Sequence, residues 1–244
     1  MQVLRFILFP FALIYWGITS LRNFCFNKKI MKSSVYSLPI INVGNLSMGG
    51  TGKTPHVEYL IRLLKNEFKV ATLSRGYGRK TQGYVLADNL STSIDIGDEP
   101  LQYQSKFGDE IYVSVGANRV EAMVHLLGEK EDTEVVVLDD AFQHRAIQAG
   151  FNILLTTFEQ PFYNDFIFPV GNLRESRKGK NRADCIIVTK CPLELSEKTK
   201  SEYRKKLRTE LPVYFSSVQY GELTSLSQHK KAIENIILVT GIAK

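Results

Sequence analysis

A glycine-rich segment carries the residue types of a phosphate-binding loop. It comprises Ser47, Met48, Gly49, Gly50, Thr51, Gly52, Lys53 and Thr54. Glycines let successive backbone N–H groups curl around phosphate oxygens, and the start of a following helix adds the positive end of its dipole. Lys53 is expected to reach the β- and γ-phosphates, and the hydroxyl of Thr54 to ligate Mg²⁺. The segment predicts nucleotide binding, although Ser47 stands where the usual GxxxxGK[ST] pattern has its first glycine.

Two adjacent carboxylates follow an apolar run. Residues 134–139 read Glu-Val-Val-Val-Leu-Asp, and Asp140 comes next. A phosphate-binding loop works with a carboxylate at the end of another buried strand, the Walker B position, which holds the metal ion. We therefore assign Asp139 to Mg²⁺ and Asp140 to the catalytic residues. The alternative is the start of a solvated loop, because paired carboxylates are unfavourable unless a cation or solvent meets them.

The sequence favours ATP over GTP as the nucleotide. GTPases of this architecture recognise guanine with an [NT]KxD signature. The segment Thr189-Lys190-Cys191-Pro192 begins like that signature, but Pro192 stands where the aspartate is required. Guanine recognition is therefore disfavoured.

Short β-rich runs alternate with helical patterns after residue 35. The expected strands cover residues 40–44, 70–74, 111–115, 134–139, 151–156, 184–189 and 236–240, and the expected helices cover 56–67, 118–128 and 196–210. Several of these strands are unbroken apolar runs, which is typical of strands covered on both faces. The pattern predicts an α/β fold like that of P-loop NTPases, with a mainly parallel sheet flanked by helices.

The composition is that of a globular protein whose excess positive charge is confined to one segment. The chain has 244 residues, 44% of them hydrophobic, with 31 Lys and Arg against 25 Asp and Glu. Six basic residues and no acidic ones precede Glu58, and these six equal the whole net charge of +6. A nucleic-acid partner is not expected, because such proteins usually spread basic charge over a domain face. Three cysteines are too few for a disulfide scaffold and favour a reducing compartment.

The N-terminal segment is predicted to lie on a membrane surface. Residues 6–21 carry no charge and lie between Arg5 and Arg22. Crossing the hydrocarbon core takes about 20 apolar residues, whereas Trp16 and Tyr15 suit a helix at the headgroup level. A buried core helix or a weak transmembrane span is the main alternative. A signal peptide is disfavoured because no small-residue cleavage site follows the run.

Several motifs occur in order from about residue 40 to 190. They are VGNLSMGGTGKTP, LSRGYGR, GDEP, VGANR, LDDAFQHR and PVGNLRES with a later RAD. Together they resemble the motifs of the lipid A 4′-kinases, also called tetraacyldisaccharide 4′-kinases. The resemblance implies transfer of the γ-phosphate of ATP to the 4′-hydroxyl of the lipid A disaccharide precursor, which forms lipid IVA. It also implies work at the cytoplasmic face of the inner membrane of a Gram-negative bacterium.

The resemblance further implies two α/β/α lobes joined by a short β ribbon, with the active site between them. On this basis we expect a membrane-associating helix at residues 1–25 and a nucleotide-binding domain at 26–170. A basic linker or loop is expected at 171–183, and the start of a second lobe at 184–244. Family members continue past the GIA motif at residues 241–243, so we expect this lobe to be incomplete.

The resemblance assigns further roles within the motifs. It implies that Asp98, in GDEP, is the catalytic base, and Glu99 is expected to help hold Mg²⁺; the alternative for GDEP is a type I turn with solvated acids. The acceptor lipid carries its own phosphate, so cationic side chains should line its site or the ATP phosphates. The candidates are Arg75, Arg79, Arg119, Arg174, Arg182 and His144. A different function also remains open at this point, a membrane-associated P-loop ATPase that switches a protein partner.

Overall fold

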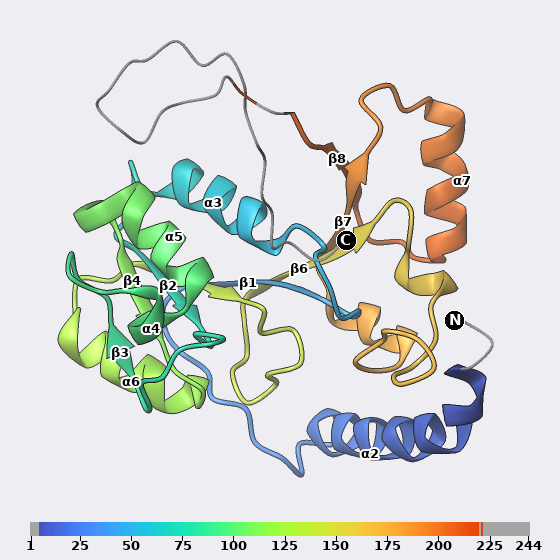
Figure 1. The fold of residues 1–244 in the computed structure, drawn as a ribbon, viewed down its shortest axis with the longest axis horizontal. Coiled ribbons are helices and arrows are strands. Elements are labelled where there is room, and N and C mark those ends of the chain that lie inside the picture. Colours follow the sequence, from blue (N-terminus) through green and yellow to red (C-terminus); the bar gives the residue numbers. More distant parts are fainter. Residues whose placement is uncertain (1–4, 220, 222–244) are drawn as a thin grey trace.

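The computed structural model describes residues 5–219 and 221, which fold around an eight-stranded sheet (Figure 1). Across the sheet the order is β3-β4-β2-β5-β1-β6-β7-β8, and all neighbours are parallel except β3 and β4. The strands are β1 (Ile40–Asn45), β2 (Val70–Ser74), β3 (Val85–Leu86), β4 (Tyr112–Val115), β5 (Val135–Asp139), β6 (Phe151–Thr157), β7 (Cys185–Cys191) and β8 (Val213–Ser217).

Helices cover both faces of this sheet (Figure 1). The α-helices are α2 (Phe9–Asn27), α3 (Lys53–Leu64), α4 (Ser93–Ile96), α5 (Asp98–Phe107), α6 (Arg119–Glu129) and α7 (Glu197–Leu207). In β5, Val135 and Val137 pack with α3 and α5 on one face, whereas Val136 and Leu138 pack with α6 on the other. The 3-10 turns are η1 (Phe6–Leu8), η2 (Gly108–Glu110), η3 (Phe162–Asn164) and η4 (Arg177–Arg182). The doubly covered sheet confirms the predicted α/β class.

The winding of the chain identifies the edge of the sheet where a ligand belongs. From β1 the chain moves to β2 and β4, returns to β5 between β2 and β1, and then crosses to β6 on the other side of β1. The winding therefore reverses around β1. Open parallel sheets bind ligands outside the carboxyl ends of the strands at such a reversal. The glycine-rich loop, which follows β1, lies at this position.

Most of the expected elements are present with shifted ends. Six of the seven expected strands appear within about two residues, and the seventh, at 236–240, lies outside the described residues. Helix α3 begins three residues earlier than expected, because Gly52 (φ 81°) turns the chain into it and Pro55 is tolerated in a first helical turn. Strands β3 and β8 and helices α4 and α5 were not among the expected elements.

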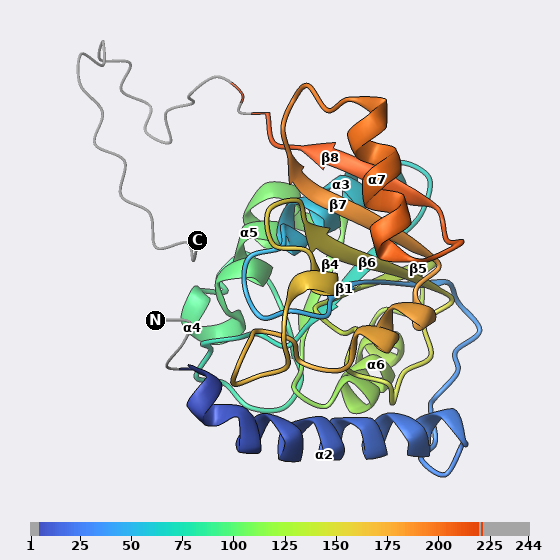
Figure 2. The same cartoon turned by 90° about the vertical axis from the view of Figure 1, so that its right-hand side faces the viewer.

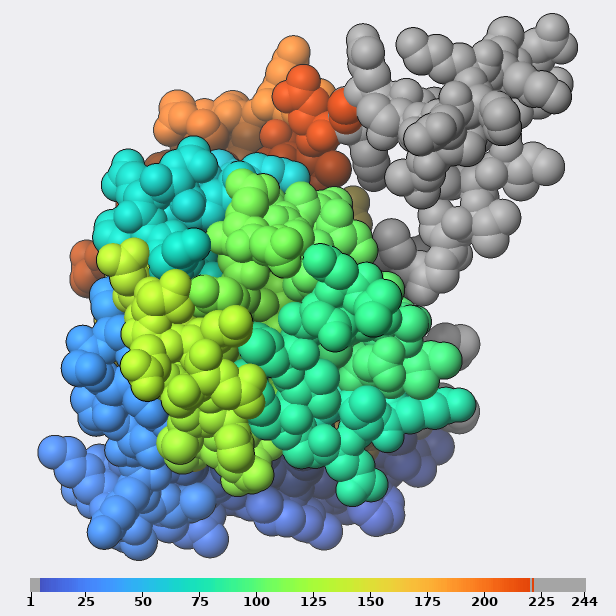
Figure 3. All heavy atoms as spheres, turned by 90° about the vertical axis from the view of Figure 1, so that its left-hand side faces the viewer, coloured from blue at the N-terminus to red at the C-terminus, as the bar shows by residue number. Residues whose placement is uncertain are grey.

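The described part of the expected second lobe continues the same sheet. Strand β7 pairs in parallel with β6, and β8 pairs in parallel with β7. The expected boundary between residues 183 and 184 therefore coincides with no break in hydrogen bonding between strands. At the other end of the sheet, the segments that contain α3, α5 and α6 form the outer surface of the molecule (Figure 3). The N-terminal segment lies along the lower edge of that surface in the same view.

Helix α2 lies along one side of the molecule (Figure 2). Most of its apolar side chains are exposed. Its buried residues are Ala12 and Phe26 alone. Over the described residues this contradicts the alternative of a core helix. Among those residues, no helix combines the length and apolar character needed to cross a bilayer. The exposed large apolar residues of α2 are Phe9, Phe11, Leu13, Ile14, Trp16, Ile18, Leu21 and Phe24.

Candidate active site

The glycine-rich loop leaves the end of β1 as an open cradle. Gly49 (φ 113°) and Gly52 (φ 81°) both adopt left-handed backbone conformations that side chains disfavour. Two hydrogen bonds hold Thr51 between them: Asn45 Nδ2 donates to its hydroxyl at 2.8 Å, and the hydroxyl of Thr189 donates to its carbonyl at 2.9 Å. The loop is thus braced from β1 and from β7, and its N–H groups meet the first turn of α3 as a phosphate site requires.

Lys53 meets the second of the predicted carboxylates. Lys53 Nζ lies 3.6 Å from Asp140 Oδ1, and Arg174 Nη1 donates to the same oxygen at 2.7 Å. Burial alone would raise the pKa of Asp140, but the charges of Lys53 and Arg174 outweigh it and hold that pKa below its usual value. Asp140 is therefore ionised at neutral pH and orients two cations beside the loop.

Asp139 has the environment of a metal ligand. It is 4% exposed, its Oδ2 accepts a hydrogen bond from the Tyr103 hydroxyl at 2.9 Å, and its Oδ1 is buried without a partner in the described residues. Burial raises the pKa of Asp139 to about 6. Burial and the negative charge of Asp139 raise the pKa of the Tyr103 phenol, and the hydroxyl of Thr54 is near enough to offset part of that rise, which places Thr54 in the same cluster. An orphaned carboxylate oxygen near a threonine hydroxyl fits Mg²⁺, which is usually bound by few protein ligands together with phosphate oxygens.

Within the described residues, no group of three or more His, Cys, Asp or Glu side chains is placed to hold a metal ion. Tyr103, which touches Asp139, was not among the residues predicted from sequence. An interior tyrosine of a helix carries no local signal for this contact.

Two glycine turns interlock to position Asp98. A Cβ on Gly97 (φ 90°) would lie 2.7 Å from the carbonyl oxygen of Tyr77, and a Cβ on Gly76 would lie 2.8 Å from that of Ile96. Only glycine permits this approach of the RGYGR and GDEP turns. Asp98 is consequently held, exposed, in the first turn of α5. The positive end of the helix dipole stabilises acidic side chains at this position.

Glu99, the next residue, lies close enough to Asp139 for its negative charge to raise the pKa of Asp139 further. Because α5 starts at Asp98, the GDEP segment begins a helix and does not form the isolated solvated turn considered as the alternative. Asp98 remains the candidate base and Glu99 the candidate auxiliary metal ligand.

Part of the predicted cationic set gathers around His144. Burial, followed by the charges of Arg119, Arg22 and Arg75, lowers the pKa of His144 to about 4. Burial also lowers the pKa of Arg119 to about 10, and the charges of Asp139, Arg75, Asp140 and Arg79 act on it too. His144 is thus neutral and Arg119 charged at neutral pH. Arg22 was named from the sequence only as the charge that ends the apolar stretch, but its guanidinium turns inward and donates to the Gln143 carbonyl at 2.9 Å.

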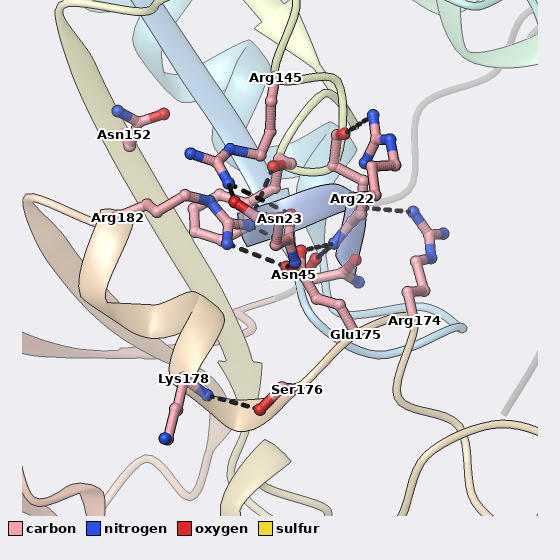
Figure 4. A network of polar contacts seen from close by, with 12 residues as sticks. Arg22, Asn23, Asn45, Arg145, Asn152, Arg174, Glu175, Ser176, Lys178 and Arg182 are labelled. Atoms are coloured by element: carbon pink, nitrogen blue, oxygen red, sulfur yellow. Dashed lines mark hydrogen bonds and ion pairs between the residues drawn. The ribbon is translucent and has the colours of Figure 1, made fainter. Parts of the chain in front are cut away.

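The other three arginines have internal partners. Arg79 donates to the carbonyl of Gly83, in its own turn, at 2.5 Å. Arg174 pairs with Asp140, as described above. Arg182 donates through both terminal nitrogens to Glu175, at 2.9 and 2.7 Å (Figure 4). The same guanidinium lies over the ring of Phe142. The guanidinium of Arg182 is therefore engaged within the protein.

The segment around Arg174 contacts the phosphate loop directly. Arg174 N donates to the Leu46 carbonyl and Met48 N donates to the Asn172 carbonyl, both at 2.7 Å, with a bridge between Ser47 and Leu173. The predicted basic linker is thus a wall of the site in this structure. Two further functional candidates are Glu175 in this wall and Gln143 after β5. Both lie within the quoted motifs, but their residue types predict no role, because that role depends on side-chain contacts between distant segments.

Comparison with known proteins gives one consistent result. The pattern of the family described as "Tetraacyldisaccharide-1-P 4′-kinase" matches residues 4–244. The chain is 50% identical to the tetraacyldisaccharide 4′-kinase of Flavobacterium johnsoniae, over 100% of this chain and 74% of that one. It is 46% identical to the protein of the same name from Bacteroides fragilis, over 97% of this chain and 66% of that one.

A solved structure agrees with these relatives. The crystal structure of "apo" form LpxK from Aquifex aeolicus in complex with ATP superposes with a TM-score of 0.74 at 35% identity. The match covers 87% of this chain and 64% of that chain. The likeness therefore covers most of the fold of this chain.

Proposed function

This chain belongs to the tetraacyldisaccharide-1-P 4′-kinase family, and we propose how its residues divide the work of transferring phosphate from ATP to the 4′-hydroxyl of the lipid A precursor. One observation carries the proposal: the braced glycine loop, Lys53, Asp139 and Asp140 meet at the winding reversal beside β1. The alternative of an ATPase that switches a protein partner is not favoured, because the family match covers residues 4–244.

In the proposed reaction Asp98 accepts the proton of the 4′-hydroxyl, and the oxygen attacks the γ-phosphorus. The bond from that phosphorus to the β–γ bridging oxygen breaks, and ADP leaves. Lys53 and Arg174 stabilise the negative charge on the transferred phosphoryl group, while Asp140 holds both cations in place.

Thr54 and Asp139, with Glu99 nearby, would hold Mg²⁺. When bound, the ion neutralises charge on the β- and γ-phosphates. Three arginines surround the neutral His144 and supply positive charge for the phosphate of the acceptor or of ATP: Arg22, Arg75 and Arg119.

The test is ATP-dependent phosphate transfer to tetraacyldisaccharide 1-phosphate in mixed detergent micelles, with wild-type protein beside Lys53→Ala. Transfer that depends on Lys53 supports the proposed function. A folded, ATP-binding protein that transfers no phosphate to this lipid would contradict it.

The Mg²⁺ requirement should depend on pH through Asp139. Only the ionised carboxylate ligates Mg²⁺, and burial raises its pKa to about 6. Protons therefore compete with the metal, so the apparent KM for Mg²⁺ should rise as the pH falls from about 7 to about 5.5. Tyr103→Phe removes a hydrogen bond that favours the ionised form, so the same rise should begin at higher pH.

Tyr112→Phe is the matched control for this experiment. Tyr112 also donates its hydroxyl to a carboxylate, that of Asp132, but on an exposed surface. Mg²⁺ titrations of the transfer rate across pH should be unchanged in Tyr112→Phe. An identical profile in wild type and Tyr103→Phe would remove Asp139 from the metal site.

We also propose that α2 rests on the cytoplasmic face of the inner membrane, where ATP and the lipid acceptor can meet the same site. Two exposed aromatic side chains that precede Arg174 in the chain extend the apolar surface of η1 and α2. Phe166 packs against Phe6 of η1, and Phe168 against Tyr15 of α2, each with ring centroids 5.8 Å apart. A continuous exposed apolar surface of this kind suits the boundary between headgroups and acyl chains.

Leu21→Glu should weaken vesicle binding by about tenfold or more, because it removes an apolar side chain from the lipid and adds a charge. Leu193→Glu is the control, since Leu193 is equally apolar and 75% exposed, against 64% for Leu21, but lies outside α2. The measurement is co-sedimentation with vesicles that contain anionic phospholipid. Equal binding by both variants would argue against α2 as the membrane contact.

A further inference from the structure

Glu175 is a buried carboxylate on which three distant segments converge. It is 2% exposed. Its oxygens accept hydrogen bonds from Asn23 Nδ2 on α2 at 2.7 Å, from Gln143 Nε2 after β5 at 3.0 Å, and from both terminal nitrogens of Arg182 (Figure 4). The bidentate arginine and two amide donors offset the cost of burying the charge. The geometry therefore fixes the positions of its partners closely.

One of these partners faces the phosphate site. Gln143 Nε2 donates both to Glu175 and to the carbonyl of Asn45, at 2.8 Å, where β1 enters the phosphate loop. With its amide nitrogen committed to two acceptors, Gln143 can only turn its oxygen toward Arg174, whose Nη1 lies 3.4 Å away. The same Nη1 donates to Asp140 at 2.7 Å. Glu175 thus determines which atom of Gln143 meets the arginine of the site.

The other side of the network reaches the apolar helix. Asn23 joins α2 to Glu175, and the hydroxyl of Tyr15, about two turns earlier on α2, donates to the carbonyl of Arg174 at 2.9 Å. Two consecutive residues, 174 and 175, therefore take their positions from α2.

Resting on the proposed function, we propose that Glu175 is a positioning residue that couples the seating of α2 to the Arg174–Asp140 pair. It touches neither nucleotide nor acceptor. Its carboxylate holds the Gln143 amide so that Arg174 is presented to the transferred phosphate when α2 is docked through Asn23. The helix that would meet the lipid surface thereby contributes to the geometry of phosphate transfer.

The test is a double-mutant cycle on kcat, measured with ATP and tetraacyldisaccharide 1-phosphate in mixed micelles. Glu175→Gln and the milder Asn23→Ala should each lower kcat, by about 10- to 100-fold and about 3- to 10-fold respectively, with the KM for ATP changed by less than about twofold. In the Arg174→Ala background, where the positioned group is gone, each should lower kcat by less than about twofold more.

Asn27→Ala is the matched control for Asn23→Ala. Asn27 also docks the end of α2, through Arg145 Nη2 at 2.7 Å, but it makes no contact with Glu175. Its kcat should equal that of wild type. Thermal unfolding of each variant shows whether it is folded, and Asn23→Ala decides the question if Glu175→Gln does not fold.

Equal losses of kcat with and without Arg174 would overturn the proposal, as would an unchanged kcat in folded Glu175→Gln or Asn23→Ala. A wild-type protein that transfers no phosphate would instead contradict the proposed function itself. The two failures are therefore distinguishable in the same experiment.

Discussion

Lys53→Ala is expected to lower kcat for phosphate transfer by about 10³-fold, the scale of losing one preorganised charge in a buried site. Lys53 is the first residue of α3, so its stem starts at the positive end of the helix beside the phosphate loop. Its ammonium lies near Asp140, and its side chain is only 15% exposed. Water cannot readily replace that charge when the phosphoryl group moves.

The fold should survive this change. Arg174 still pairs with Asp140 at 2.7 Å, so no carboxylate is left buried and alone. Lys65→Ala serves as the control, because Lys65 lies just past the end of the same helix and pairs with Glu110, away from the site. The measurement is kcat together with the melting temperature. A folded Lys53→Ala that retains wild-type kcat would exclude this lysine from the chemistry.

The sheet could be predicted from sequence because its strands carry their own pattern. The run Val135–Leu138 is apolar at every position because it packs on both faces, and that composition is visible without any tertiary knowledge. Helix α5 could not be found this way. Its start depends on Gly97 fitting against the carbonyl of Tyr77, a contact that exists only after the chain has folded.

The residues of the site likewise separate into those that a local sequence pattern predicts and those that depend on contacts in the folded chain. The phosphate loop and the Asp139–Asp140 pair are local in sequence, and the structure brings them together. Arg182 was predicted from its charge to meet a phosphate, and in this structure its guanidinium is occupied by Glu175. Tyr103 and Glu175 were missed for the converse reason, since each acquires its role from partners at least seven residues away. A sequence shows which side chains are charged, but it does not show which partners they contact in the folded protein.

Asp98→Asn is expected to lower kcat by about 10²- to 10⁴-fold with the KM for ATP changed by less than about twofold, since it removes a general base and no nucleotide contact. The amide keeps the size of the side chain, and the turn beneath it is fixed by Gly97 rather than by the carboxylate. Asp109→Asn, another exposed acid of the same region, should leave kcat unchanged.

The neighbouring carboxylate makes this prediction decisive. Glu99 influences Asp139 and is the candidate auxiliary metal ligand. Loss of a metal ligand weakens Mg²⁺ binding, so saturating Mg²⁺ should restore much of the rate in Glu99→Gln. Loss of the base leaves no group to accept the proton of the acceptor hydroxyl. Added Mg²⁺ cannot take over that role at any concentration. Recovery of Asp98→Asn at high Mg²⁺ would therefore reassign Asp98 to the metal and require a different base.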